Sequence, residues 1–234
     1  MIRARLAELQ LAVMLLTRAP AGRLPEPAPA IAAAAWAFPL AGLVPGLLGA
    51  AVLASGLPVM LAAGLALAAQ MAVTGALHED GLADVADGFW GGRTRDRRLE
   101  IMRDSRIGSY GTLALIVAAG LRWQAMALAG PVALILAAVA SRVAPVALMA
   151  TLPPARSDGM GHAARAVTAG PLALAALIGL GPLILCGQVP AVAVAAAVVI
   201  ALALIARRKI GGQTGDVLGA GQQLAEIALL IALI

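Results

Sequence analysis

The sequence predicts an all-α integral membrane protein, built as a polytopic bundle of six or seven transmembrane helices. Of its 234 residues, 62% are hydrophobic and only 12% are charged, and the mean hydropathy is +0.94. A soluble globular domain is close to half apolar and a quarter charged, so the composition excludes that class. A single cysteine excludes a disulfide scaffold and a zinc site with several cysteine ligands. We expect one membrane-embedded domain over residues 1–234.

Long stretches without charge mark the expected spans. The ranges 27–78 and 166–206 contain no Asp, Glu, Lys or Arg, and each is long enough for two helices of about 20 residues. A third apolar range, 107–155, contains only Arg122 and Arg142 and is divided at Gly130-Pro131. The predicted spans are 31–53, 57–77, 107–129, 132–150, 167–186, 190–206 and, as a seventh, 217–234.

Two local signals refine this layout. Pro39 and Pro45 predict a kink or break within the first span, which a bilayer tolerates only with compensating contacts. The stretch before Arg18 is too short and too charged at its start to cross a membrane. It is expected to be an interfacial helix.

The charged residues gather in four segments that hold all but three of them: 1–26, 78–106, 151–165 and 207–216. The connections that alternate with them are short and uncharged: 54–57, 129–131 and 187–190. By the positive-inside rule the charged segments face the cytoplasm, and we expect the functional site on that face. The net charge of +5 is spread over these clusters, so nucleic-acid binding is not indicated.

Three aspartates in one of these segments are the strongest chemical signal. Asp80, Asp84 and Asp87 stand at i, i+4 and i+7, within about 60° of one face if the segment is helical. Carboxylates so close repel unless a cation or a base lies among them. Mg²⁺ takes such hard oxygen ligands together with substrate phosphates. Their nearest basic neighbour after the cluster is Arg93, so pairing with arginines is the less favoured interpretation.

Other polar residues allow a structural and a functional interpretation. Asp96 and Glu100 lie among arginines and are expected to form solvated ion pairs. His78 is either an interfacial polar residue or a base. Arg122, Arg142 and Glu226 lie inside apolar runs, where a structural Arg–Glu pair and a substrate-lining role are equally supported.

One further patch suits phosphate binding. Arg103-Asp104-Ser105-Arg106 is followed by Gly108-Ser109-Tyr110-Gly111, in which glycines let the backbone approach a ligand. The segment 211–220 contains Thr214 and Asp216 and is too rich in Gly, Thr and Asp to be only a connector. A third patch, 156–161, is equally consistent with a simple turn.

These motifs resemble the cobalamin synthase family, the adenosylcobinamide-GDP ribazoletransferases. The resemblance runs in family order over nearly the whole chain, through Leu15–Arg18, Phe38–Gly42, His78–Gly88, Leu99–Gly111, Ser141-Arg142, Asp158–Gly161 and Gly212–Ala220.

The resemblance implies a multi-pass, Mg²⁺-dependent transferase of the inner membrane. Such an enzyme joins adenosylcobinamide-GDP to α-ribazole or its 5′-phosphate, releases GMP and forms adenosylcobalamin or its 5′-phosphate. The implied catalytic residues are Asp80, Asp84, Asp87 and His78. The implied metal ligands are Glu79, Asp80, Asp84, Asp87 and Asp104. The implied substrate-binding residues are Arg103, Asp104, Ser105, Arg106, Thr214 and Asp216.

Two rival functions are weighed against this interpretation. A CDP-alcohol phosphotransferase also attacks a pyrophosphate with clustered aspartates, but its usual Asp-Gly-x-x-Ala-Arg opening is absent, because Asp84 stands where that pattern continues. A transporter would place ionisable groups near the bilayer midplane in repeated halves, whereas most acids here lie at span ends in one loop. The expected partners are the two substrates and membrane lipid, and the sequence leaves a homo-oligomer open.

Overall fold

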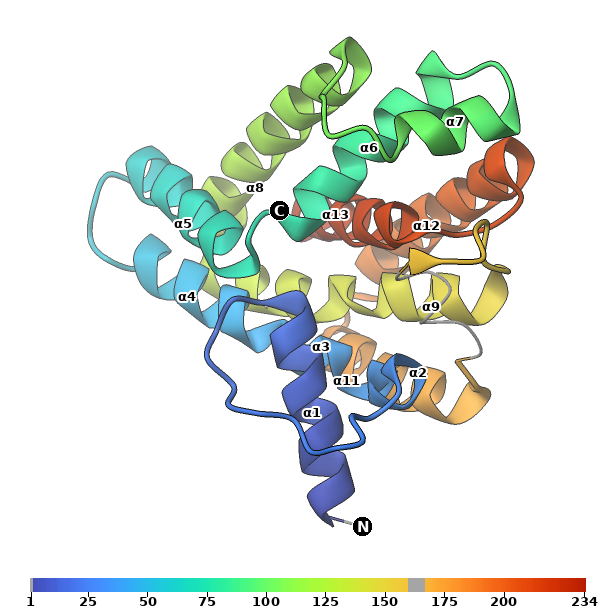
Figure 1. Ribbon diagram of the computed structural model, residues 1–234. Helices are drawn as coiled ribbons and strands as arrows, with labels where there is room; N and C mark the ends of the chain where they lie inside the picture. Colours follow the sequence, from blue (N-terminus) through green and yellow to red (C-terminus); the bar gives the residue numbers. More distant parts are fainter. Residues whose placement is uncertain (1, 160–166) are drawn as a thin grey trace.

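The computed structural model describes residues 2–159 and 167–234, and this part of the chain is all-helical apart from one isolated bridge, between Pro154 and Gln213 (Figure 1). The predicted all-α class is therefore confirmed. Met160 and Gly161 of the 156–161 patch lie outside the described residues. The helices are α1 (Ile2–Leu16), α2 (Ile31–Ala34), the 3₁₀ helix η1 (Ala35–Ala37), α3 (Phe38–Ala41), α4 (Leu43–Leu53), α5 (Val59–Thr74), α6 (Leu77–Gly91), α7 (Arg95–Ile101), α8 (Ser109–Ser141), α9 (Val143–Thr151), α11 (Ala169–Leu185), α12 (Val189–Ile210) and α13 (Gly215–Ala232).

Three helical stretches among the described residues are long and apolar enough to cross a membrane: 31–53, 109–151 and 189–210. There are four if α5 and α6, which meet at an angle of 89°, are counted together. The first stretch is divided into α2, η1, α3 and α4, with Pro39 at the start of α3. The 3₁₀ helix directly before Pro39 agrees with the distortion predicted there, whereas Pro45 lies within α4 and causes no break.

The stretch 109–151 is interrupted at Gly130, which has φ 81° and ψ 177° and precedes Pro131. A continuous helix of 43 residues would be about 65 Å long, roughly twice the hydrocarbon thickness of a bilayer. Ala125 and Met126 before the break, and Leu134 and Ala137 after it, belong to one buried cluster. Both halves of α8 therefore face the same core.

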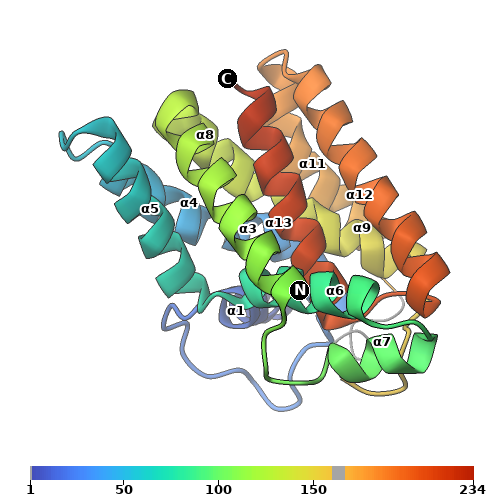
Figure 2. The ribbon, with the colours of Figure 1, turned by 90° about the horizontal axis from the view of Figure 1, so that it is seen from above.

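The charged segments meet at one end of the bundle. In Figure 2, α6 and α7 lie at this end, opposite the α4–α5 and α11–α12 connections. Two arginines of α7 tie the segments together through backbone carbonyls. Arg95 donates to Ile210 (3.0 Å) and to Ala155 (2.6 Å), and Arg98 donates to Lys209 (3.0 Å). We call the end of the bundle formed by α6, α7 and the segments around Ala155 and Ile210 the polar end.

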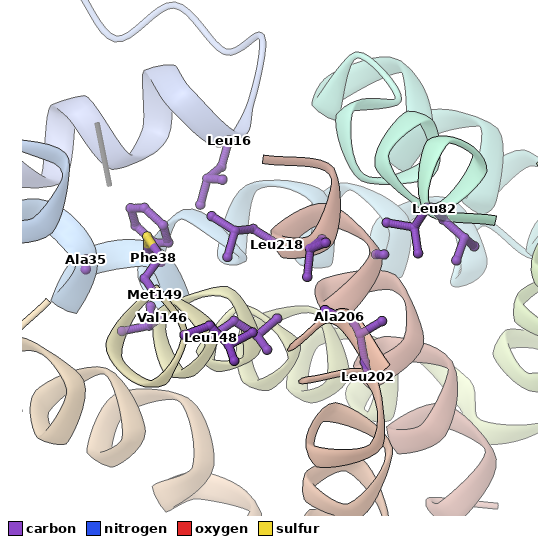
Figure 3. Packing of buried hydrophobic residues seen from close by; sticks show 14 of the residues in the cluster. Leu16, Ala35, Phe38, Leu82, Val146, Leu148, Met149, Leu202, Ala206 and Leu218 are labelled. Carbon is purple, nitrogen blue, oxygen red and sulfur yellow. The ribbon is translucent and has the colours of Figure 1, made fainter. Parts of the chain in front are cut away.

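A buried cluster holds α6 against the rest of the molecule. Figure 3 shows Leu82 of α6 and Leu218 of α13 in the same cluster as Phe38 and Leu148. The backbones of α6 and α13 also come close, since a Cβ atom on Gly81 would lie 2.8 Å from the Asp216 carbonyl oxygen. Glycine at this position is therefore a packing requirement, because any side chain would push the two helices apart.

Candidate active site

The carboxylates predicted as the chemical centre lie on α6, which runs across the polar end. The chain turns into α6 through Gly75 and Ala76, both in the left-handed region (φ 66° and 54°). This turn produces the 89° angle between α5 and α6. Along α6, Asp80 is exposed, Asp84 is half-buried and Asp87 is buried, so the three do not share one environment.

Two cavities meet at Asp80. The first, of about 440 Å³, is lined by the carboxylates of Glu79, Asp80, Asp84 and Asp104 together with Arg103 and Arg106, and we call it the basic cavity after these two arginines. The second, of about 170 Å³, is lined mostly by apolar residues with four ionisable side chains among them, and we call it the apolar cavity. Its apolar wall includes Leu15, Leu16, Ile31, Phe38, Met149 and Leu218, and its ionisable side chains are His78, Asp80, Arg156 and Asp216. The structure thus brings together aspartates and arginines that the sequence placed in separate motifs.

Electrostatic repulsion identifies which carboxylates lie close to one another. Burial, together with Asp216, Asp80 and Asp87, raises the pKa of Asp84 from 3.8 to about 7. Burial also raises the pKa of Asp216, although the guanidinium of Arg156, 3.8 Å away, opposes that shift. Asp216 therefore belongs with the acids of α6, although the sequence suggested it only as a substrate-binding residue.

The carboxylates beside Asp80 fit Mg²⁺ only if substrate phosphates supply part of its coordination shell. Among residues 2–159 and 167–234, no three Asp, Glu, His or Cys side chains converge closely enough to hold a metal ion by themselves. Mg²⁺ commonly binds one or two carboxylates and completes its shell with water and substrate phosphates. Asp80 and Asp84, one helical turn apart beside the basic cavity, match that arrangement.

Asp87 has a different partner from the one expected. Its carboxylate accepts hydrogen bonds from the backbone N–H groups of Gly108 (2.7 Å) and Gly111 (2.9 Å) at the start of α8. A Cβ atom on Gly108 would lie 2.5 Å from Asp87 Oδ1. The glycines predicted to let the backbone approach a phosphate instead allow this carboxylate to cap a helix. That interpretation of the Gly-Ser-Tyr-Gly run is corrected.

Glu79 and Asp104, the remaining metal-ligand candidates, are also engaged by arginines. Glu79 Oε1 accepts from Arg122 (2.7 Å) inside the bundle. Asp104 pairs with Arg106 (2.6 Å) on the surface, and this contact lowers the pKa of Asp104 to about 2. Arg103 makes a two-fold contact with Asp158 (2.6 and 2.7 Å).

The structure also shows the surroundings of three further predicted site residues, His78, Thr214 and Ser105. His78 is buried, and its Nε2 has no hydrogen-bond partner. Thr214 caps α13 by accepting from the Val217 N–H (3.3 Å), and its hydroxyl donates to Asp216 (3.1 Å). Ser105 lies on the wall of the basic cavity.

Sequence reasoning assigned no role to Arg156, which the structure places beside Asp216. Its Nη2 donates to the Leu99 carbonyl (2.8 Å), and its buried Nε has no partner. The only sequence signal was its position in the 156–161 patch, which was equally consistent with a turn. By contrast, the expected ion pairs of Asp96 with Arg95 (3.4 Å) and of Glu100 with Arg97 (2.8 Å) are confirmed.

Comparisons with known proteins cover nearly the whole chain. A family model described as Cobalamin-5-phosphate synthase matches residues 8–234. A protein of Bradyrhizobium diazoefficiens named adenosylcobinamide-GDP ribazoletransferase is 48% identical over 245 residues, which is 98% of this chain and 94% of the relative. Relatives with the same name from Mesorhizobium japonicum (45% identical; 97% and 92% covered) and Azorhizobium caulinodans (47%; 86% and 83%) are also similar. No solved structure matches the chain.

Proposed function

The chain belongs to the cobalamin-5-phosphate synthase family, and on that premise we propose that it is an adenosylcobinamide-GDP ribazoletransferase of cobalamin biosynthesis. It transfers the adenosylcobinamide-phosphate group to α-ribazole or its 5′-phosphate and releases GMP. A CDP-alcohol phosphotransferase and a transporter are not favoured, because the family match extends over residues 8–234.

The observation that carries the chemistry is the position of Asp80 between a cavity that combines carboxylates with two arginines and a cavity whose wall consists mostly of apolar residues. The substrates differ in the same way. Adenosylcobinamide-GDP brings a pyrophosphate, for which Arg103 and Arg106 supply cationic donors. The ribazole brings a flat, apolar base. We assign the pyrophosphate to the basic cavity and the ribazole base to the apolar cavity.

The reaction is a displacement at the phosphorus that carries cobinamide. A ribose hydroxyl oxygen of the ribazole forms a bond to this phosphorus, and the bond to the GMP oxygen breaks, so GMP leaves with the electron pair. Asp216 receives the hydroxyl proton, because it lines the apolar cavity and burial raises its pKa, which favours its protonated form. His78, whose Nε2 is enclosed by the protein, is the less suitable acceptor.

Charge on the phosphates is balanced at the other cavity. Mg²⁺ bound by Asp80, Asp84 and the substrate pyrophosphate would neutralise negative charge there. Arg103 and Arg106 hold the pyrophosphate once they leave Asp158 and Asp104. Both ion pairs are exposed, so separating them costs little.

The arrangement in the membrane follows from the same polar end. We assign the six or seven predicted spans to an inner-membrane bundle with this end in the cytoplasm, in agreement with its many arginines. The interruption at Gly130 supports the assignment of 109–151 to two spans. α6 and α7 lie outside the spans.

Turnover by detergent-purified protein tests the function. Adenosylcobinamide-GDP and α-ribazole 5′-phosphate are supplied with and without Mg²⁺, and GMP and the cobalamin product are measured. Equal amounts of both products, formed only with Mg²⁺, are expected. Absence of product from folded protein would contradict the proposal, and activity without any divalent cation would remove its metal component.

A pair of variants tests the assignment of the cavities. Leu15→Gln places an amide on the wall of the apolar cavity, and Arg103→Gln removes a charge from the basic cavity. Leu15→Gln is expected to raise the KM for the ribazole by roughly tenfold, the equivalent of about 1.4 kcal/mol, without changing the KM for adenosylcobinamide-GDP. Arg103→Gln is expected to do the reverse. The same KM change in both variants would disprove the assignment.

A further inference from the structure

A network of charged side chains lies in the interior of the bundle next to the site, and one of its members, Glu79, also lines the basic cavity. Arg122 of α8 is 3% exposed. Its Nη1 donates to Glu79 (2.7 Å) and Gln223 (3.1 Å), and its Nη2 donates to Gln70 (2.9 Å) and Glu226 (3.0 Å). One guanidinium therefore joins α8 to α5, α6 and α13.

The surrounding residues complete the network on the side of α13. Glu226 Oε2 accepts from Gln222 (2.5 Å), and Gln222 also donates to Ser141 (3.0 Å). Arg142 Nη1 lies 4.0 Å from the same oxygen. Two arginines and two glutamates thus balance in charge, as buried groups in an apolar bundle must. Of the two interpretations open from the sequence, the structural Arg–Glu pair is the one seen.

Such a network is a weak source of stability. Replacing a buried ion pair by well-packed apolar residues is often neutral or stabilising, because removing the charges from water is costly. A geometric role accounts better for a network in which one arginine contacts three other helices. The contacts differ in where they lead: Glu226 lies deep in α13, whereas Glu79 is adjacent to Asp80.

The position of Glu79 controls the direction of the functional carboxylates. Successive side chains on a helix point about 100° apart, so holding Glu79 toward Arg122 turns Asp80 and Asp84 toward the cavities. The nearby contact of α6 with α13 is made by Gly81 and Gly219. These glycines present no side chain that would resist rotation of α6. The ion pair of Glu79 supplies a directional contact that they lack, at the end of α6 opposite to the hydrogen bonds of Asp87 with the start of α8.

We propose that Arg122 is a positioning residue, which acts through Glu79 to set the rotation of α6 and so to aim Asp80 and Asp84 at the cavities. This role rests on the proposed transferase function. It also gives Glu79 a task other than the metal ligation expected from the sequence.

Two matched variants separate positioning from structural support. Glu79→Gln and Glu226→Gln each replace one of the two carboxylates that contact Arg122 by an uncharged amide of nearly the same shape. For each folded variant, kcat, the Mg²⁺ concentration for half-maximal rate and the Tm are measured. Both are expected to lower the Tm. Glu79→Gln is expected to lower kcat about tenfold and raise the Mg²⁺ requirement severalfold, while Glu226→Gln keeps both within about twofold.

Equal effects of the two variants on kcat and on the Mg²⁺ requirement would overturn the proposal and leave only a structural network. If Glu79→Gln does not fold, it is replaced in the experiment by the double variant Glu79→Gln with Arg122→Gln, which removes both charges of the pair. Wild-type kcat in that folded double variant would equally overturn the proposal. An inactive wild-type protein would count against the transferase function instead, so the two failures are distinguishable.

Discussion

Asp84→Asn is expected to reduce turnover by about 100-fold or more while leaving the protein folded in detergent. The carboxylate of Asp84 is half-buried beside the basic cavity, and its pKa of about 7 reflects crowding by burial and by other acids. The amide keeps the shape but removes the negative charge that would meet a cation and the substrate phosphates. Losses of this size are typical when one group that stabilises transition-state charge is removed.

Asp96→Asn is the matched control for this variant. The side chain of Asp96 is 93% exposed. Within the described residues, its only ion pair is with the neighbouring Arg95. Its replacement is expected to leave turnover unchanged within about twofold, because an exposed pair of this kind contributes little. Wild-type rates in Asp84→Asn would remove this carboxylate from the reaction.

Asp87→Ala is expected to destabilise the fold more than it affects any ligand. The change leaves the N–H groups of Gly108 and Gly111 without their acceptor at the start of α8. Buried donors without partners cost about 1–3 kcal/mol each, so the variant should show a clearly lower Tm and poor recovery from detergent. Asp87→Asn, which keeps one acceptor oxygen, is expected to be intermediate.

The readout that decides the role of Asp87 is the comparison of Tm with the Mg²⁺ requirement. Asp104→Ala serves as a control, since Asp104 also accepts from a backbone N–H, that of Arg106 (3.1 Å), but in an exposed turn. A small change of Tm is expected there. If Asp87→Ala kept the wild-type Tm and needed more Mg²⁺, Asp87 would be a metal ligand as the sequence suggested, and its capping role would be secondary.

Local sequence patterns were sufficient for the elements that present the site. The helical spacing of Asp80 and Asp84 is realised in α6, and Arg103 and Arg106 of the segment that follows line the basic cavity with them. The same reasoning grouped Asp87 with them, because periodicity describes only where a side chain leaves its helix. Periodicity does not show which element packs against that face of the helix. Here the start of α8 packs against Asp87.

The ion pairs inside the bundle could be predicted from the sequence only as one of two alternatives, the other being a substrate-lining role. Arg122 and Glu226 are 104 residues apart, and Arg122 and Glu79 are 43 apart. A buried charge in an apolar run requires a partner, which predicts that a pair exists. The choice of Glu79 as well as Glu226 depends on how α6, α8 and α13 cross.

The sequence by itself determined the helical membrane class, the family and the collection of charged segments at one end. These follow from composition and from motifs, since burying uncharged helices and solvating charged ends is favourable whatever the packing. Only the tertiary structure decided the partner of each acid. Asp80 and Asp84 remain at the cavities, Asp87 caps α8, Glu79 enters the interior, and Asp216 joins the acids of α6. The physical reason is that these contacts join residues far apart in the chain, and their geometry exists only once the helices have packed.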